Sequence, residues 1–446
     1  GTNPKGKLSS LQESTAVGSF CDVPELSYDF QAPIREYGQI SETAKELKLL
    51  SMFAHDYGET FCNMQPQFAG DDCESTSVHT GDFQDAEDLS AFRMITRRNG
   101  DQGYLFVNNY QRGYEMAEHK DVMLRVQTAD GEISFPKQDI KNGAYFFYPF
   151  NFLLSDDVTL RWINQAPLCN INRKLWFFYG NEKMQYEADE KLSGQVLISM
   201  DRIWAKYAWR MKKYPNILFF SALPILETEN GIEVICRSDR AQKNCWIIMD
   251  ATVEDAKTWI DNGWKKPDII PDFLHVEGDA STICVLSHDL TAADNQTVAS
   301  FTHTDVNNCI IRKEKNVFHR AEKTDFSEAE ACAIDDTGKD YQEYVIRISY
   351  DKAYDVAKEN IFLQIDFQAD QAELYLNGEK IADQYFIGDV WEVSLKRFDF
   401  PTELILRLYP LEEDDKIYLE TQPDYVNGRC CSLKDIRCVY EYKEKL

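Results

Sequence analysis

The chain has 446 residues, of which 43% are apolar and 13% aromatic, a composition that supports folded domains and excludes a disordered chain. Its length allows two or three domains. The formal net charge of −27 excludes a nucleic-acid partner, because phosphate recognition needs clustered lysine and arginine. The most apolar stretch, 145–154, contains Pro149 and is far shorter than the roughly 20 apolar residues of a membrane span, so no membrane partner is expected.

The first predicted element is a helix from Ser41 to about Tyr57. Leu47, Leu50 and Ala54 recur at i, i+3 and i+7, which is one apolar stripe of a helix, and Ser41 is the expected N-cap. Residues 63–90 are rich in Gly, Asp, Ser and Thr and are expected to form a connector between domains.

From residue 91 onward, period-two alternation of apolar and polar residues predicts short strands. Residues 91–270 are expected to form a β-sandwich domain, with a hairpin at Asp130-Gly131 and short helices near 199–212 and 253–262, the second capped by Thr252. Residues 271–446 are expected to form a second sandwich of the jelly-roll type, in which Asn377-Gly378 predicts a type I′ turn.

The chain has 12 cysteines, with no Cys-x-x-Cys pair and no zinc-like Cys/His spacing. They are scattered through a long chain, which favours reduced, buried thiols and a cytoplasmic protein. The seven histidines lie far apart in the sequence, so no metal site is expected, and no motif calls for a cofactor.

Several segments together resemble one enzyme family. Gly1-Thr2-Asn3-Pro4 and residues 26–38 (LSYDFQAPIREYG) resemble the end of the catalytic barrel in glycoside hydrolase family 35, the β-galactosidases. Residues 101–112 (DQGYLFVNNYQR), 148–152 (YPFNF) and 165–168 (QAPL) resemble pieces of its second domain. Residues 375–382 and 388–393, which include Trp391, resemble a jelly-roll hairpin shared by many sugar hydrolases. Trp391 suits either sugar stacking or the core of the sandwich.

The resemblance implies a mainly β chain, in which antiparallel β-sandwich and jelly-roll domains follow a remnant of a TIM barrel. Residues 1–62 would be that remnant, namely the end of the last strand and the last helix. Tyr28 matches the family tyrosine that lines the galactose pocket, whereas Phe30 replaces a second tyrosine. The alternative for Tyr28 is a half-buried loop aromatic.

The same resemblance implies a function. Family members hydrolyse terminal β-D-galactosyl bonds with retention, using two carboxylates that would precede Gly1 here, so no catalytic residue is expected in this chain. The chain is therefore predicted to be the C-terminal part of a β-galactosidase, inactive alone, whose partner is a β-galactoside. The alternatives are a non-catalytic carbohydrate-binding protein and a structural β-sandwich scaffold, and a homo-oligomer is left open.

Overall fold

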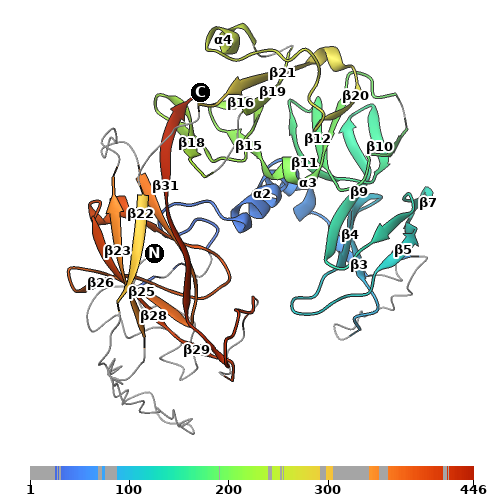
Figure 1. Cartoon of the computed structure of the whole chain (residues 1–446). Coiled ribbons are helices and arrows are strands. Elements are labelled where there is room, and N and C mark those ends of the chain that lie inside the picture. The colour runs from blue at the N-terminus through green and yellow to red at the C-terminus, as the bar shows by residue number, and fades with distance from the viewer. Residues whose placement is uncertain are drawn as a thin grey trace, which may run out of the picture. The chain divides into compact units, whose positions relative to one another are not determined.

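The computed structural model describes residues 26–27, 29, 32–68, 73–75, 88–189, 191–239, 244–251, 254, 256–291, 298–304, 341–350, 360–414, 419 and 421–446. The fold is mainly β, as predicted, and almost all strand pairs are antiparallel. The chain forms two compact units (Figure 1). Unit 1 consists of Gly1–Ser41, Ile235–Ala241 and Ala292–Glu444, and unit 2 of Glu42–Val234, Gln242–Thr291 and Lys445–Leu446. The four-part division into 1–62, 63–90, 91–270 and 271–446 stays a prediction.

The first part of unit 2 is a sandwich of one large and two small antiparallel sheets. The large sheet has the order β1 (Gln65–Phe68), β3 (Arg93–Asn99), β4 (Gln102–Asn109), β9 (Ala144–Ser155), β10 (Val158–Ile163) and β13 (Tyr186–Ala188). The small sheets are β2 (Cys73–Ser75), β6 (Leu124–Thr128) and β7 (Gly131–Ser134), and β5 (His119–Val122) with β8 (Gln138–Ile140). The predicted hairpin at Asp130-Gly131 is confirmed, because β6 pairs with β7 and Gly131 has a φ of 112°, which glycine adopts without strain.

The second part of unit 2 packs two four-stranded sheets around a common core. One sheet has the order β11 (Ala166–Ile171), β12 (Leu175–Tyr179), β14 (Val196–Met200) and β20 (His275–Gly278). The other has the order β15 (Ala208–Met211), β16 (Tyr214–Phe220), β19 (Asn244–Asp250) and β21 (Ile283–Asp289), and a hairpin of β17 (Ile225–Thr228) and β18 (Gly231–Arg237) follows β16. Fully buried residues of both sheets, such as Leu168, Phe177, Phe220 and Ile248, form one cluster.

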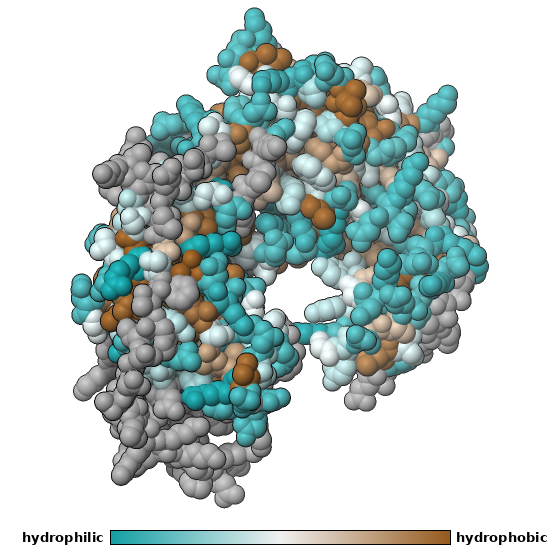
Figure 2. Space-filling model, in the orientation of Figure 1, coloured by the Kyte–Doolittle hydropathy of each residue, from teal (hydrophilic) through white to brown (hydrophobic). Residues whose placement is uncertain are grey.

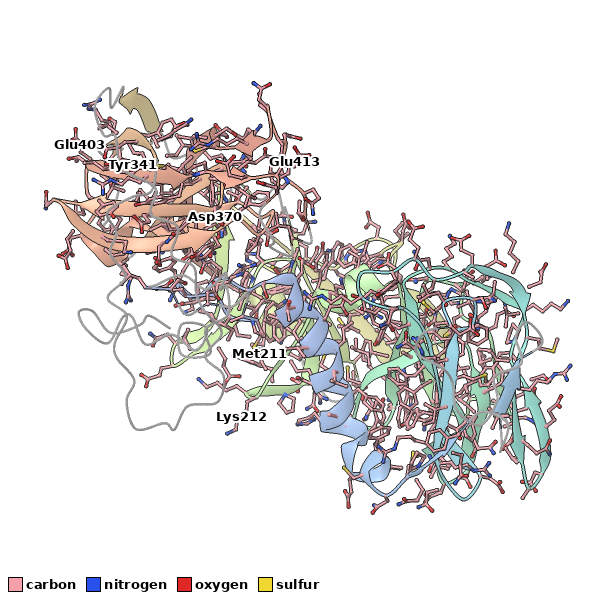
Figure 3. All side chains as sticks on the ribbon, turned by 90° about the horizontal axis from the view of Figure 1, so that it is seen from below. Met211, Lys212, Tyr341, Asp370, Glu403 and Glu413 are labelled. Atoms are coloured by element: carbon pink, nitrogen blue, oxygen red, sulfur yellow. The ribbon has the colours of Figure 1, made fainter. Side chains whose placement is uncertain are left out.

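The helices of this part are short. The helix predicted over 199–212 is wrong in length: α3 covers Arg202–Lys206, and the chain then pairs with β16 as strand β15. That strand buries Ala208 and Met211, so the apolar residues that suggested a helix serve the sheet instead (Met211 is labelled in Figure 3). The helix α4 (Ala256–Asp261) lies inside the predicted range 253–262, and η2 (Ala280–Thr282) is a single 3₁₀ turn. The predicted cap Thr252 lies outside the described residues.

The long helix α2 (Glu42–Cys62) confirms the first predicted element but turns the opposite face to the protein. The stripe expected to be buried is solvent-exposed, with Leu47 at 46% and Leu50 at 60% exposure. The buried stripe is instead Leu49, Met52, Phe53 and Tyr57. The helix packs against β11 and α3 within unit 2, beside the sheets in Figure 3. A remnant of a TIM barrel over residues 1–62 is therefore not confirmed, and residues 1–25 lie outside the described part of the chain.

Unit 1 contains a β-sandwich. One sheet has the order β22 (Val298–Thr304), β23 (Gln342–Ser349), β28 (Glu403–Tyr409), β25 (Gln371–Leu376) and β26 (Glu379–Tyr385). Facing it are β31 (Ser432–Lys445), β24 (Asn360–Gln368) and β27 (Trp391–Ser394), with the short pair β29 (Leu411–Glu412) and β30 (Arg429–Cys430) and the 3₁₀ turn η3 (Leu395–Phe398). Alternate residues of both sheets, such as Ile346, Leu363, Leu374 and Leu406, are fully buried in one core.

The hairpin predicted at Asn377-Gly378 is confirmed. It joins β25 to β26, and both turn residues have positive φ, 51° and 83°. Trp391 is 7% exposed and packs edge-on against Phe367 at 6.3 Å between ring centroids, so this ring belongs to the core of unit 1 and cannot stack on a sugar.

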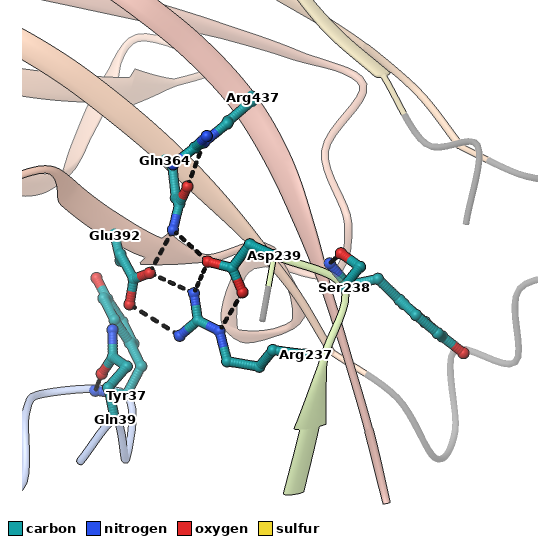
Figure 4. A network of polar contacts seen from close by, with 9 residues as sticks. Tyr37, Gln39, Arg237, Ser238, Asp239, Gln364, Glu392 and Arg437 are labelled. Carbon is teal, nitrogen blue, oxygen red and sulfur yellow. Dashed lines mark hydrogen bonds and ion pairs between the residues drawn. The ribbon is translucent and has the colours of Figure 1, made fainter. Parts of the chain in front are cut away.

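A buried ion-pair network fixes residues 237–239 to strands β24 and β27 of unit 1 (Figure 4). Arg237, only 5% exposed at its side chain, donates to both oxygens of Asp239 at 3.2 and 3.3 Å and to both oxygens of Glu392. Gln364 donates to both carboxylates, at 3.2 Å to Asp239 and 2.7 Å to Glu392. Arg437 in turn donates to Gln364 Oε1 at 2.6 Å. Two carboxylates thus share one guanidinium and one amide, which satisfies charges that would be costly to bury alone.

Glu441 next to this network is expected to make unit 1 less stable as the pH rises. Burial and the charge of Glu392 raise the pKa of Glu441, outweighing Arg237, Lys443 and a hydrogen bond to Asn360. The folded pKa therefore exceeds the ordinary 4.5, and stability falls as the pH rises from 4.5 through the folded pKa. We expect Glu441→Gln to stabilise unit 1 at pH 7 and to have no effect below pH 4.5. Urea titrations read from the β24 amide signals would measure this, and equal stability of both proteins at pH 7 would contradict it.

The eight cysteines whose state the structure gives are free thiols, and most are buried, as at Cys169 and Cys245. No helix in the described ranges combines the length and the apolar character needed to cross a membrane. The visible surface of both units is mostly hydrophilic (Figure 2), in keeping with the charge of −27.

Candidate functional site

A groove of about 910 Å³ runs along unit 2. Its lining comes from α2, from strands β3, β4 and β9 of the large sheet, from β8 and from the residues after β12. Residues that are distant in sequence meet here because α2 packs against β11 and leaves part of the large sheet uncovered. A concave site of this size, with apolar walls and a few polar groups, is the usual form of a small-molecule site.

Aromatic rings form the walls of the groove. Phe53 on α2 contacts Phe147 on β9 at 5.0 Å and Phe61 at 5.7 Å between ring centroids. Phe106 on β4 stacks on Phe147 at 5.3 Å with an interplanar angle of 20°. These edge-on and stacked contacts hold each ring in a fixed orientation, so the walls are rigid.

A tyrosine and an ion pair form one side of the groove. Tyr145 at the start of β9 is 49% exposed, and its ring lies 4.6 Å from the guanidinium carbon of Arg202. Arg202 also donates to the Tyr145 hydroxyl at 3.0 Å and to Glu46 on α2 at 2.5 Å. The cation and the hydrogen bond together fix the tyrosine ring while leaving half of it open to solvent.

Glu46 is held in its charged form. Burial alone would raise its pKa, but hydrogen bonds and charges from Arg202 and Lys206 more than offset this and lower the pKa. The Lys206 Nζ lies 2.6 Å from Glu46 Oε1. A carboxylate whose pKa is lowered in this way is an acceptor at neutral pH and is unsuited to acting as a general acid.

Arg97 on β3 lies in the groove without a carboxylate partner. Its guanidinium carbon is 4.7 Å from the centre of the Phe61 ring, and Nη2 donates to the Met64 carbonyl oxygen at 2.8 Å. Nε is shielded from solvent and has no acceptor. In the part of the chain that the structure describes, no carboxylate lies within salt-bridge distance of this cation. The groove therefore contains a positive charge that no described carboxylate compensates.

The amide of Gln138 is oriented by its neighbour. Tyr148 donates its hydroxyl to Gln138 Oε1 at 2.7 Å, so the Gln138 carbonyl is occupied. The Gln138 Nε2 is shielded from water and, among the described residues, has no acceptor. The amide is thus held in place in the wall of the groove and its donor is not exposed to a ligand.

Strand β9 also contributes backbone groups. It pairs with β4 over Ala144–Phe150, but its pairing with β10 begins only at Phe150. Over residues 144–149 the second edge of β9 has no strand partner among the described strands. Backbone N–H and C=O groups that point away from β4 at such an edge are available to a ligand, except the N atom of Pro149 and the N–H of Ala144, which donates to the Lys141 carbonyl at 3.1 Å.

The site residue predicted from sequence, Tyr28, lies outside the described residues, as do Phe30 and Gly1-Thr2-Asn3-Pro4. Its neighbours are described. Leu26 and Ser27 donate their backbone N–H groups to the buried carboxylate of Asp383 at 3.0 Å. Asp29 lies 3.9 Å from Arg35, which pairs with Asp389 at 3.2 Å. Unit 1 therefore anchors the chain on both sides of position 28.

No sequence pattern indicated that the groove is a site. Tyr145 was visible only as the start of an apolar stretch, and Arg202 only as part of a predicted helix. Alternation along 144–148 does place Tyr145 and Phe147 on one face, but nothing local distinguishes an exposed tyrosine of this kind from a core residue. Among the described residues no group of three or more His, Cys, Asp or Glu could hold a metal.

Comparison with known proteins adds little. No family model matches the sequence, and no curated protein matches it. Among solved structures, the chain is similar to the GH31 α-xylosidase from Xanthomonas citri, with 9% identity and a TM-score of 0.14, over 83% of this chain and 38% of that one. The chain thus spans well under half the length of that enzyme, and a TM-score this low does not show a shared fold, so membership of family 35 stays a prediction.

Proposed function

We propose that this chain is a carbohydrate-binding, β-rich part of a glycoside hydrolase of the family 35 type, and that the groove of unit 2 holds the sugar. The observation that carries the proposal is the groove itself, in which rigid aromatic walls stand next to the half-exposed ring of Tyr145.

The chemistry of a sugar matches what this groove offers. A pyranose has an apolar C–H face that packs on an aromatic ring, and Tyr145 presents such a ring in a fixed orientation. Its hydroxyls both donate and accept hydrogen bonds. The open edge of β9 supplies backbone donors, and the carboxylate of Glu46 and the backbone carbonyls supply acceptors.

The galactosidase part of the proposal comes from the motifs in residues 1–38 and 101–168. Retention needs two carboxyl groups about 5–5.5 Å apart, one of them able to act as an acid. Two places in the sequence bring an Asn next to a Glu, Asn181-Glu182 and Asn377-Gly378-Glu379, and neither meets this need. Glu182 is an exposed residue after β12, and Glu379 is exposed beyond the turn of the β25–β26 hairpin. We therefore propose no catalytic residue in this chain.

Calorimetric titration with galactose and lactose tests the proposal. We expect measurable binding to the intact chain and about fivefold weaker binding by Tyr145→Ala, because an aromatic contact of this kind contributes about 1 kcal/mol. Tyr114→Ala is the matched control, since Tyr114 is 61% exposed and does not line the groove. In a separate assay, nitrophenyl β-galactoside should show no turnover with this chain.

Three outcomes would count against the proposal. Equal sugar affinities for Tyr145→Ala and the intact chain would remove the groove as the sugar site. Turnover by this chain alone would show that its catalytic carboxylates lie within these 446 residues. A complete absence of sugar binding would favour the structural scaffold.

A further inference from the structure

Charge in the groove is distributed unevenly. Arg202, on one side, is neutralised by Glu46 at 2.5 Å. Arg97, among the apolar residues Phe61 and Pro66, is not neutralised. The remaining charged residues of the lining, Asp139, Lys141 and Glu182, are exposed to water, where salt and solvent screen their charge. Among the described residues of the lining, Arg97 is therefore the one partly shielded charge that lacks a counter-charge.

A cation in such a place is costly unless something compensates it. Half-buried guanidinium groups are normally paired with a carboxylate, and this protein has 75 acidic residues from which a partner was available. The contacts that Arg97 does make, the Phe61 ring and the Met64 carbonyl, orient the guanidinium without neutralising it. An oriented but uncompensated guanidinium is an anion-binding group, and its planar donors match a carboxylate best.

We propose, on the basis of the sugar-binding function above, that the Arg97 end of the groove binds a carboxylate carried by the sugar. The ligand is then an acidic saccharide that contains a uronic acid. The aromatic walls take the faces of the sugar rings, and Arg97 takes the carboxylate. The overall charge of −27 repels anions, so a preference for an acidic sugar has to come from a local contact and not from the field of the whole protein.

The matched probes are D-galacturonate and D-galactose, which differ only in a carboxylate in place of the hydroxymethyl group, with acetate as a carboxylate without a sugar. At low ionic strength we expect galacturonate to bind about tenfold more tightly than galactose, and added salt to reduce the difference. Arg97→Gln should abolish the preference and leave galactose binding within about twofold. Arg97→Lys should keep part of it, because lysine retains the charge but not the planar donors.

Lys141→Gln is the control, since it removes a lining charge that is exposed to water. If Lys141→Gln reduced the preference for galacturonate over galactose as much as Arg97→Gln, the inference would be overturned. The preference would then come from the general electrostatic field of the groove and not from a contact with Arg97. Equal affinities for the two sugars in the intact chain would overturn it while leaving the proposed function in place. Binding of neither sugar would overturn both this inference and the proposed function. If acetate bound as tightly as galacturonate, the ligand would be a simple carboxylate and not an acidic saccharide. Thermal unfolding would establish that each variant is folded.

Discussion

Arg237→Met should destabilise unit 1 by about 3–5 kcal/mol. The substitution leaves Glu392 and Asp239 facing each other with no cation between them, and the loss of one partner from a buried pair typically costs this much. In the intact chain the hydrogen bonds and charge of Arg237, together with hydrogen bonds from Gln364 and Gln39, outweigh burial and lower the pKa of Glu392, so this carboxylate is charged at neutral pH and depends on Arg237 for its compensation. Urea titration followed by the β24 amide signals measures the change in unit 1 alone.

The control for Arg237 is a pair on the surface of the same unit. Arg347 and Glu403 are each 60% exposed and lie 3.2 Å apart, and Arg347→Met should cost about 1 kcal/mol or less. A further variant checks the cause. In the Arg237→Met background, Glu392→Gln removes one of the unpaired charges and should restore part of the loss. A loss for Arg237→Met no larger than that for Arg347→Met would show that the network contributes nothing special to stability.

Phe53→Ala should destabilise unit 2 by about 3–5 kcal/mol. Phe53 is 4% exposed, and its ring contacts four others, those of Tyr57, Phe61, Tyr104 and Phe147, at 5.0–5.7 Å between centroids. Truncation removes this contact area and leaves a cavity between α2 and the large sheet, and phenylalanine truncations in cores fall in this range. Urea titration read from the amide signals of β4 and β9 would give the value.

Leu50→Ala is the control on the same helix. Leu50 is 60% exposed, so its truncation should change the free energy of unfolding by no more than about 0.5 kcal/mol. The two variants also decide between two faces of α2. If the stripe of Leu47, Leu50 and Ala54 faced the protein, the order of the two effects would be reversed.

The helix α2 shows how far the sequence could lead. Its existence followed from helical periodicity, and that prediction is confirmed. Its orientation did not follow, because the helix has two apolar stripes, one through Leu47 and Leu50 and one through Leu49 and Phe53. Periodicity shows that an apolar stripe exists but not which of two stripes a sheet will cover. Here the sheet covers the stripe that contains the aromatic residues, because its burial removes more apolar area from water.

The strands were easier to predict than the helices. Alternation and turn residues located the β6–β7 and β25–β26 hairpins, because register and turn chemistry are local properties. The short helix α3 was overestimated, since Ala208 and Met211 are equally compatible with a helix and with the buried face of strand β15.

The groove could not be predicted at all. Tyr145, Arg202 and Glu46 come from β9, α3 and α2 and meet only in three dimensions. Arg97 is notable because no described carboxylate pairs with it. The residues next to Arg97 in the sequence do not show whether a carboxylate from another strand will lie beside it.

Unit 1 is assembled from three separate segments of the chain, and this affects the order in which the protein folds during synthesis. Arg237 contacts Glu392, which follows it by 155 residues, so at about 5–20 residues per second the ribosome delivers the partner roughly eight to thirty seconds later. Nearly all of unit 2 has been made by Thr291 and can fold during that interval. A nascent or truncated chain that stops before β24 would present residues 235–241 without the strands that receive them, and such a chain is a natural target for chaperones and proteases.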